Sequence, residues 1–213
     1  ASRIKNLVTA VKELGMDSVA ITDHGVMYGT IDFYKECLKQ GVKPIIGCEV
    51  YLAPGSRKER QEINGVKYYH LILLAENQTG YRNLVQLVSL ANIEGMYYKP
   101  RVDKELLKKY HEGIICLSAC VAGEIPRALI QGNKAKAESL VQEYLNIFGK
   151  DNFFLEIQNH GLAEERISNA GLVELAQKYN IGLVATNDCH YVSRADSEFH
   201  DILLCIQMGK TID

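Results

Sequence analysis

Asp188 and His190 stand two residues apart in the segment Thr186-Asn187-Asp188-Cys189-His190. In an extended segment, residues i and i+2 point to the same face, so a carboxylate and an imidazole at this spacing can bind one ion together. This pair of donors suits zinc, manganese or iron. A turn formed by Asn187 and Asp188 beside an incidental histidine explains the same residues equally well. The pair alone therefore indicates a metal site without deciding it.

Two further residues of ligand chemistry belong to apolar segments. His24 follows the apolar residues 18–21, and because neighbouring side chains point to opposite sides, only one of Asp23 and His24 is expected to bind a metal directly. We choose His24, and Asp23 either orients a ligand or caps a helix. Glu49 lies within an apolar segment, where a buried carboxylate requires a cation, a hydrogen-bond network or an exposed face.

Other candidates are ambiguous when taken singly. His70 precedes the apolar run 71–74 and alone is more typical of a core histidine, and Cys120 alone is more typical of a small buried hydrophobe. Glu156, His160 and Asn187 are expected to support ligands or to line the rim of a site. Taken together, the candidates favour a metal site more than any one of them does, because six possible ligands are distributed over successive expected strands. These six are His24, Glu49, His70, Cys120, Asp188 and His190.

Helical periodicity alternates with short apolar segments, and this pattern must position the candidate ligands. It predicts β-α-β units and a parallel sheet, either open or closed into a barrel, at whose carboxyl-terminal edge the candidates would converge. The Asn64-Gly65 pair predicts a hairpin-like loop within residues 55–66. Helices are expected over residues 4–14, 28–40, 79–93, 134–148 and up to 178, and strands over residues 18–21, 44–51, 68–74, 114–118, 153–157 and 182–186.

Composition limits the classes of function. The 213 residues, of which 47% are hydrophobic and 23% charged, are enough for the core of one domain. The net charge of −2 gives no basic footprint, so any main contact with DNA is expected elsewhere. Six cysteines without framework spacing predict free thiols in the cytoplasm. No apolar stretch approaches the ~18 residues of a membrane span, so a soluble protein is expected.

The order and spacing of several segments resemble the PHP (polymerase and histidinol phosphatase) phosphoesterases. Within that family, the chain resembles the PHP domains of bacterial replicative DNA polymerases, the polymerase III alpha subunits. The resemblance implies a distorted seven-stranded β/α barrel with a cluster of up to three divalent ions, zinc or manganese, and it matches six metal-binding positions to the six candidates above. The matching segments are residues 21–25, 47–51, 70–75, 80–84, 99–101, 117–120, 124–126, 156–161 and 185–191.

The resemblance also implies how the domain is bounded. The family carries a His-x-His pair and an acidic residue on a first strand, just before a stretch like residues 1–4. Residues 1–213 are therefore expected to be an N-terminally truncated PHP domain without that first strand, running into the start of the polymerase region. The carboxylates that add nucleotides are not among these residues.

By the same resemblance, the parent protein is expected to be a DNA-directed DNA polymerase. Its partners would be DNA and other polymerase III holoenzyme subunits, with no membrane. The domain itself is expected to be a 3′ to 5′ proofreading exonuclease, inactive as truncated, in which Glu49, Asp188 and His190 act through bound metals. One alternative is a non-catalytic structural domain that docks a separate proofreading subunit. Another is a stand-alone histidinol-phosphatase-like enzyme, which the polymerase-like residues 80–84 and 99–101 argue against.

Overall fold

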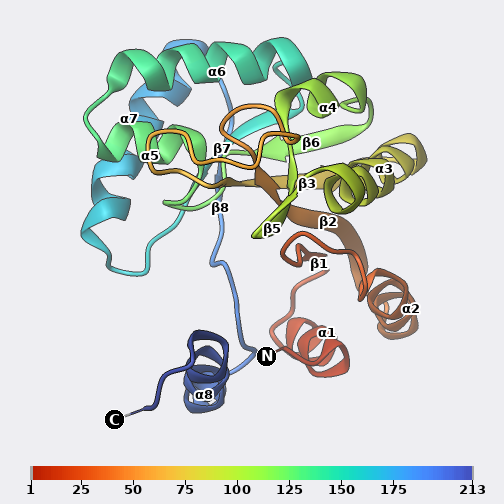
Figure 1. Cartoon of the computed structure of the whole chain (residues 1–213). Coiled ribbons are helices and arrows are strands. Elements are labelled where there is room, and N and C mark those ends of the chain that lie inside the picture. The colour runs from red at the N-terminus through yellow and green to blue at the C-terminus, as the bar shows by residue number, and fades with distance from the viewer. Residues whose placement is uncertain (1, 213) are drawn as a thin grey trace. The chain divides into compact units, whose positions relative to one another are not determined.

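The structure is a computed structural model that describes residues 2–212. The chain divides into two compact units, which are described separately (Figure 1). Unit 1 contains the chain up to Ile21, the segment Gly29–Ile45 and the chain from Asp188 onward. Unit 2 contains Thr22–Tyr28 and Ile46–Asn187. Among the described residues, no helix combines the length and hydropathy needed to cross a membrane.

Unit 1 is mainly helical. Helix α1 buries Val8 and Val11, and helix α2 buries Phe33 and Cys37. Helices α1 and α2 pack together, and the side chain of Thr9 hydrogen-bonds that of Gln40 across the contact. The elements of the unit are α1 (Ile4–Glu13), β1 (Ser18–Ile21), α2 (Thr30–Gln40), the 3-10 helix η1 (Arg194–Asp196) and α8 (Ser197–Met208).

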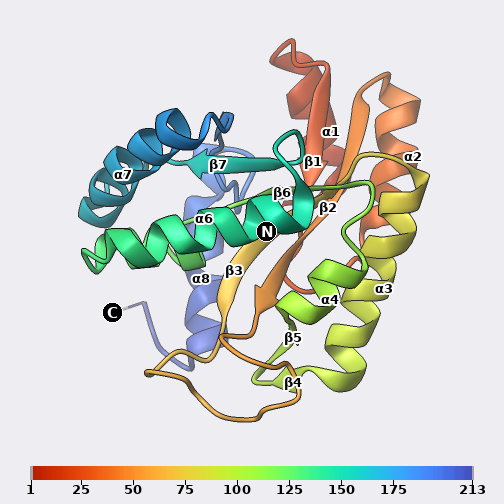
Figure 2. The same cartoon turned by 90° about the horizontal axis from the view of Figure 1, so that it is seen from above.

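Unit 2 holds most of the sheet and the helices that cover it. Helix α3 contacts β3 and β5, and helices α6 and α7 contact β7 (Figures 1 and 2). Its elements are β2 (Lys43–Leu52, which begins in unit 1), β3 (Tyr69–Ala75), α3 (Gln78–Glu94), β4 (Met96–Tyr97), β5 (Lys99–Val102), α4 (Lys104–Lys109), β6 (Ile114–Leu117), α5 (Glu124–Ile130), α6 (Lys134–Phe148), β7 (Phe153–Ile157), α7 (Ala163–Tyr179) and β8 (Leu183–Ala185).

The strands form a mixed sheet in the order β4-β5-β2-β3-β6-β7-β8, with β1 paired to β2. The predicted α/β class is confirmed, but the expectation of a purely parallel sheet is wrong at β3. Strand β3 runs antiparallel to both β2 and β6, whereas the β2–β5, β6–β7 and β7–β8 pairs are parallel. A parallel pair needs a crossover, and the chain returns from β2 to β3 through a loop without a helix, so β3 reverses.

Sheet register separates a core face from a polar face in unit 2. Cys48 and Val50 of β2 point into the core beside Leu71 and Leu73 of β3, where leucines of α3 cover them. Because successive strand residues alternate in direction, the next positions lie on the opposite face. The antiparallel register pairs Glu49 with Ile72 and Tyr51 with His70 on that face. Burial of the core face therefore fixes the direction of Glu49 and His70.

The loop between β2 and β3 is held by two buried arginines. Arg57 Nη1 donates to both carboxylate oxygens of Asp103, at 3.0 and 3.1 Å, and Nη2 donates to Glu94 Oε2 at 2.6 Å. Arg101, only 1% exposed, donates to the carbonyls of Arg57, Glu59 and Lys67. The predicted Asn64-Gly65 turn is present, flanked by hydrogen bonds between Ile63 and Val66.

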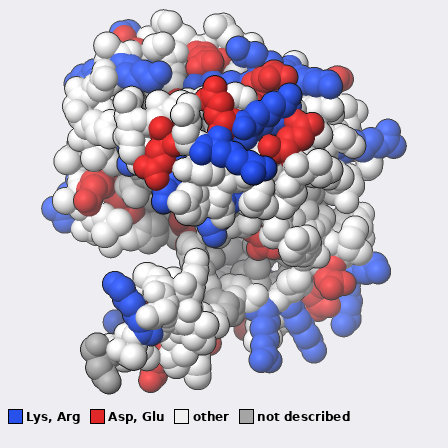
Figure 3. Space-filling view, in the orientation of Figure 1, with Lys and Arg blue, Asp and Glu red and all other residues white. Residues whose placement is uncertain are grey.

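Charged side chains of both signs are present on the face that Figure 3 shows. In Figure 3, Lys and Arg side chains lie among Asp and Glu side chains on the face that is visible. This arrangement agrees with the net charge of −2, which is spread over 24 basic and 26 acidic residues. Broad electrostatic attraction to a duplex is not a feature of this face.

Candidate metal centre

Glu49 is the buried centre of the candidate site. Its side chain is 5% exposed, and Oε1 lies 3.1 Å from His24 Nδ1 and 2.5 Å from His70 Nδ1. Burial alone would raise the pKa of Glu49, but the two imidazoles outweigh it and hold this pKa at about 2. Among the described residues, Oε1 has no well-aligned hydrogen-bond donor despite these close contacts. A buried, charged oxygen in this situation fits a cation.

His24 reaches Glu49 because their backbones pair. The Gly25 N–H donates to the Glu49 carbonyl at 2.9 Å, and the Glu49 N–H donates to the Asp23 carbonyl at 3.1 Å. Gly25 has φ +67°, and a Cβ there would lie 3.0 Å from the Tyr51 ring. Glycine is therefore required for the turn to approach the sheet this closely. The pKa of Asp23 is raised by burial, which its neighbour His24 partly offsets.

A tight turn brings Cys120 to His70. The His70 N–H donates to the Ala122 carbonyl at 3.1 Å, and the Gly123 N–H closes the turn onto the Cys120 carbonyl at 2.8 Å. Ala119, buried just before Cys120, adopts φ +62°, a left-handed conformation that is costly for alanine. A strained residue kept beside a possible ligand is typical of a functional site. Cys120 Sγ lies 3.7 Å from His70 Nδ1.

The donor atoms of Glu49, His70 and Cys120 lie within 4.8 Å of one another. His24 contacts the same carboxylate oxygen of Glu49 that His70 approaches. A carboxylate, imidazoles and a thiol together are a ligand set suited to zinc, and the thiol makes magnesium or calcium unsuitable. The structure thus brings together four of the six ligands expected from the sequence, all within unit 2.

Asp188 and His190 belong to unit 1. His190 Nδ1 lies 2.8 Å from the Asp188 carbonyl and 3.7 Å from its Oδ1, so the two side chains are neighbours. Asp188 adopts φ +46°, a left-handed conformation like that of Ala119. The His190 ring also lies 5.5 Å from the ring of His200. Convergence of Asp188 and His190 with Glu49 and His24 stays a prediction.

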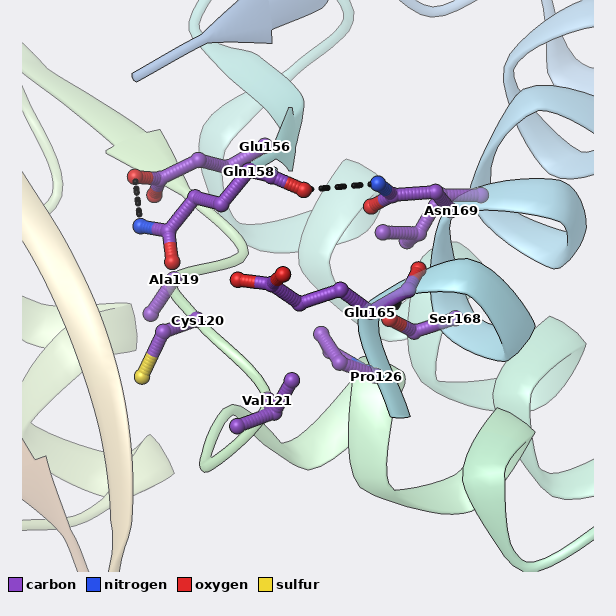
Figure 4. A pocket seen from close by; sticks show the side chains of 10 residues that line it. Ala119, Cys120, Val121, Pro126, Glu156, Gln158, Glu165, Ser168 and Asn169 are labelled. Atoms are coloured by element: carbon purple, nitrogen blue, oxygen red, sulfur yellow. Dashed lines mark hydrogen bonds between the residues drawn. The ribbon is translucent and has the colours of Figure 1, made fainter. Parts of the chain in front are cut away.

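Glu156 and Gln158 line a small pocket that also includes Cys120 (Figure 4). Glu156 is 4% exposed, and its Oε1 accepts hydrogen bonds from Thr186 Oγ1 at 2.5 Å and from Gln158 Nε2 at 3.1 Å. These bonds join the ends of β7 and β8. Glu156 thus lies in a hydrogen-bond network and shares a pocket with Cys120, and its role in supporting a site stays a prediction.

His160 links two loops through a carboxylate that sequence reasoning missed. Its Nδ1 lies 2.6 Å from Glu165 Oε1, and its Nε2 lies 2.8 Å from the carbonyl of Asn187, the residue before Asp188. Glu165 also accepts the backbone N–H groups of His160 and Leu162. Burial would raise the pKa of Glu165, but these bonds lower it below its ordinary value. The spacing of five residues between His160 and Glu165 was the available signal.

The fold is an α/β domain with a candidate metal centre, and comparison with known proteins gives its family. A family model described as PHP domain matches residues 1–160, so the chain belongs to the PHP domain family. The chain is 54% identical over 211 residues to DNA polymerase III subunit alpha of Treponema pallidum, covering 99% of this chain and 18% of that protein. It is 47% identical over 217 residues to the same subunit of Thermus aquaticus, again covering 18% of that protein and 100% of this chain. The chain therefore spans about a fifth of the length of these relatives.

Solved structures share the fold at low sequence identity. A protein from Bifidobacterium adolescentis named for metal-dependent phosphoesterase activity has a TM-score of 0.59 at 12% identity, covering 96% of this chain and 91% of that one. An amidohydrolase from Chromobacterium violaceum has a TM-score of 0.54 at 12% identity, covering 88% of this chain and 82% of that one. The predicted PHP-type fold is thereby confirmed, and identities this low support the fold alone.

Proposed function

We propose that this chain is the PHP domain of a bacterial replicative DNA polymerase and that it hydrolyses phosphodiester bonds at the 3′ end of DNA with the help of bound metal. The observation that carries the proposal is the buried Glu49 carboxylate with His70 and Cys120, whose donor atoms lie within 4.8 Å of one another. The names of the polymerase relatives support the parent protein. The fold of a neighbour named as a metal-dependent phosphoesterase supports the class of reaction.

Each candidate ligand has a separate role in the proposed site. Glu49 is ionised at neutral pH and would supply negative charge to a cation, with His24 and His70 as neighbouring donors. Cys120 adds a soft donor, which favours zinc, with manganese as the alternative and up to three ions in the complete domain. Asp188 and His190 are proposed to complete the shells. Bound metals of this kind lower the pKa of a water molecule and stabilise charge on a phosphate.

We further propose that residues 1–213 belong to a PHP domain within a longer polymerase, since the chain covers 18% of each of these two polymerase relatives. The partners would then be DNA, reached through the parent polymerase, and the other subunits of the polymerase III holoenzyme. A replicative polymerase works on the chromosome, so the proposed location is the bacterial cytoplasm. The free cysteines of the described chain are compatible with that compartment.

The proposal is tested on the full-length protein that carries this domain. Metal content after purification and release of nucleotides from a mismatched 3′ end are measured for the wild type, His70→Ala and Cys120→Ser. Cys205→Ser, which changes a partly exposed cysteine of α8, is the matched control. We expect the control to behave as the wild type, and both site variants to lose at least 10-fold in zinc affinity and in nucleotide release. Equal zinc binding and equal release in all four proteins would refute the proposal.

A metal-bound protein without nuclease activity would separate the two parts of the proposal. Zinc also stabilises folds, so zinc that raises the melting temperature without any release of nucleotides would assign the site a structural role. The same measurement with manganese in place of zinc covers a site whose activity depends on the other expected ion.

A further inference from the structure

An exposed tyrosine stands in a strained turn between β4 and β5. Tyr98 adopts φ +60°, a left-handed conformation that is a genuine outlier for a bulky residue, and it is 68% exposed. Its ring packs edge to face on Tyr97 at 4.8 Å, and the Lys67 ammonium lies 3.9 Å from the ring centre. Glycine would fit this turn without strain. The contacts with Tyr97 and Lys67 still leave most of the Tyr98 side chain exposed, so the ring is accessible to a ligand.

Aromatic rings and lysines continue from this turn to the candidate metal centre, all within unit 2. Lys67 precedes Tyr68, whose ring stacks on the ring of His70 at 6.1 Å and 7°. Tyr68 also meets Tyr51 edge to face at 4.8 Å, and the Lys99 ammonium lies 5.7 Å from the centre of the Tyr51 ring. The contacts thus lead from an exposed ring to a candidate metal ligand.

We propose that Tyr98 is a base-stacking platform for single-stranded DNA, with Lys67 and Lys99 contacting its phosphates. This inference rests on the proposed function and names the substrate of that site: an unpaired 3′ end whose scissile phosphate is delivered to Glu49 and His70. Aromatic faces stack on any base, and lysines add charge complementarity to the backbone. A paired base keeps its faces covered by its neighbours, so duplex DNA cannot use the platform.

One acidic residue opposes the proposed contact. The Glu62 carboxylate lies 3.4 Å from the Lys67 ammonium and competes with a phosphate for it. Removing this carboxylate leaves Lys67 available, so Glu62→Gln is expected to bind single-stranded DNA about 3-fold more tightly, and Lys67→Gln about 3-fold more weakly. Opposite effects from two neighbouring residues of one ion pair are difficult to produce by a change in folding.

The test measures fluorescence anisotropy of a labelled 12-nucleotide single strand with the full 213-residue chain, in the presence of a chelator so that neither metal nor hydrolysis contributes. The variants are Tyr98→Gly, Lys67→Gln and Glu62→Gln. Tyr34→Ala removes another exposed tyrosine, on α2, and serves as the control. A duplex of the same length is measured in parallel, and melting temperatures are recorded for every variant.

We expect Tyr98→Gly to weaken binding of the single strand about 10-fold while its melting temperature stays equal to or above that of the wild type, because glycine relieves the strain. Wild-type affinity in Tyr98→Gly, a parallel fall in melting temperature and binding, or equal affinity for the duplex would each overturn the inference. None of these results bears on the proposed hydrolysis, which is tested separately by zinc binding and nucleotide release in the His70→Ala and Cys120→Ser variants.

Discussion

Replacing Glu49 by glutamine should change how the stability of the fold depends on pH. The pKa of Glu49 falls from an ordinary 4.5 to about 2 in the folded chain, where burial opposes the contacts with His24 and His70. At ~1.4 kcal/mol for each pKa unit, this difference corresponds to about 3 kcal/mol of stability. Glu49 is 5% exposed, so solvent screening removes little of that amount.

The sign of this pH dependence follows from the direction in which folding shifts the pKa of Glu49. A carboxyl group whose pKa is depressed by folding stabilises the fold above its unfolded pKa, and this contribution is lost as pH falls through the folded pKa. The stabilisation by ionised Glu49 is therefore lost as the pH falls from 4.5 to about 2. By pH 3, about 2 kcal/mol of the stabilisation should be gone. Glutamine cannot ionise, so the variant lacks this pH dependence.

The assay is urea denaturation at several pH values from 6 to 3, with a chelator present, for the wild type and Glu49→Gln. The quantity of interest is the difference between their free energies of unfolding, because other carboxyls cancel in it. We expect this difference to shrink by about 2 kcal/mol between pH 6 and pH 3. Glu112→Gln, which removes an exposed carboxylate, is the control. A difference that stays constant with pH would refute the assignment of a charged Glu49 between two imidazoles.

Three other perturbations test the thiol of Cys120, the ion pair of Arg57 and the contact of His160 with Asn187. Iodoacetamide should label Cys120 after chelation but spare it in the zinc-bound protein, because coordination masks the thiolate; equal rates would remove it from the ligands. Arg57→Met should lower the free energy of unfolding in urea by about 3 to 5 kcal/mol, because it leaves the buried Asp103 carboxylate without its ionic partner, and a loss below ~1 kcal/mol would contradict that account. His160→Ala should weaken zinc affinity about 10-fold in a chelator competition, because it releases the backbone of Asn187 ahead of two proposed ligands; unchanged affinity would count against their role.

Long periodic segments were predictable from the sequence, and short ones were not. The periodicity over 134–148 and the apolar run 153–157 coincide with α6 and β7. Strands β4 and β5 were missed because they have two and four residues and because Pro100 interrupts the β pattern. Helix α4 has six residues, which is too short for a periodic signal. The direction of β3 was also missed, because periodicity carries no information on the pairing partner.

The candidate ligands were identified by residue type, whereas their geometry depends on contacts across the sequence. Glu49 and His70 could be named from their surroundings in the chain, but that the His70 imidazole reaches the Glu49 carboxylate follows from the pairing of β2 with β3. Similarly, the link from His160 to Asn187 spans 27 residues and appears only in the fold. Local patterns specify which donors exist, and tertiary pairing specifies which of them meet.

Glu49 and His70 lie on a strand face, which ties their geometry to the core. A slip of one residue between β2 and β3 would turn Glu49 into the core and bring Cys48 to the polar face. Such a slip would also expose Val50, which is 1% exposed, at a cost of about 1.5 to 3 kcal/mol for that side chain alone. Apolar packing on one face therefore holds the Glu49 carboxylate in position on the other, and the arrangement of Glu49 and His70 should persist when no metal is bound.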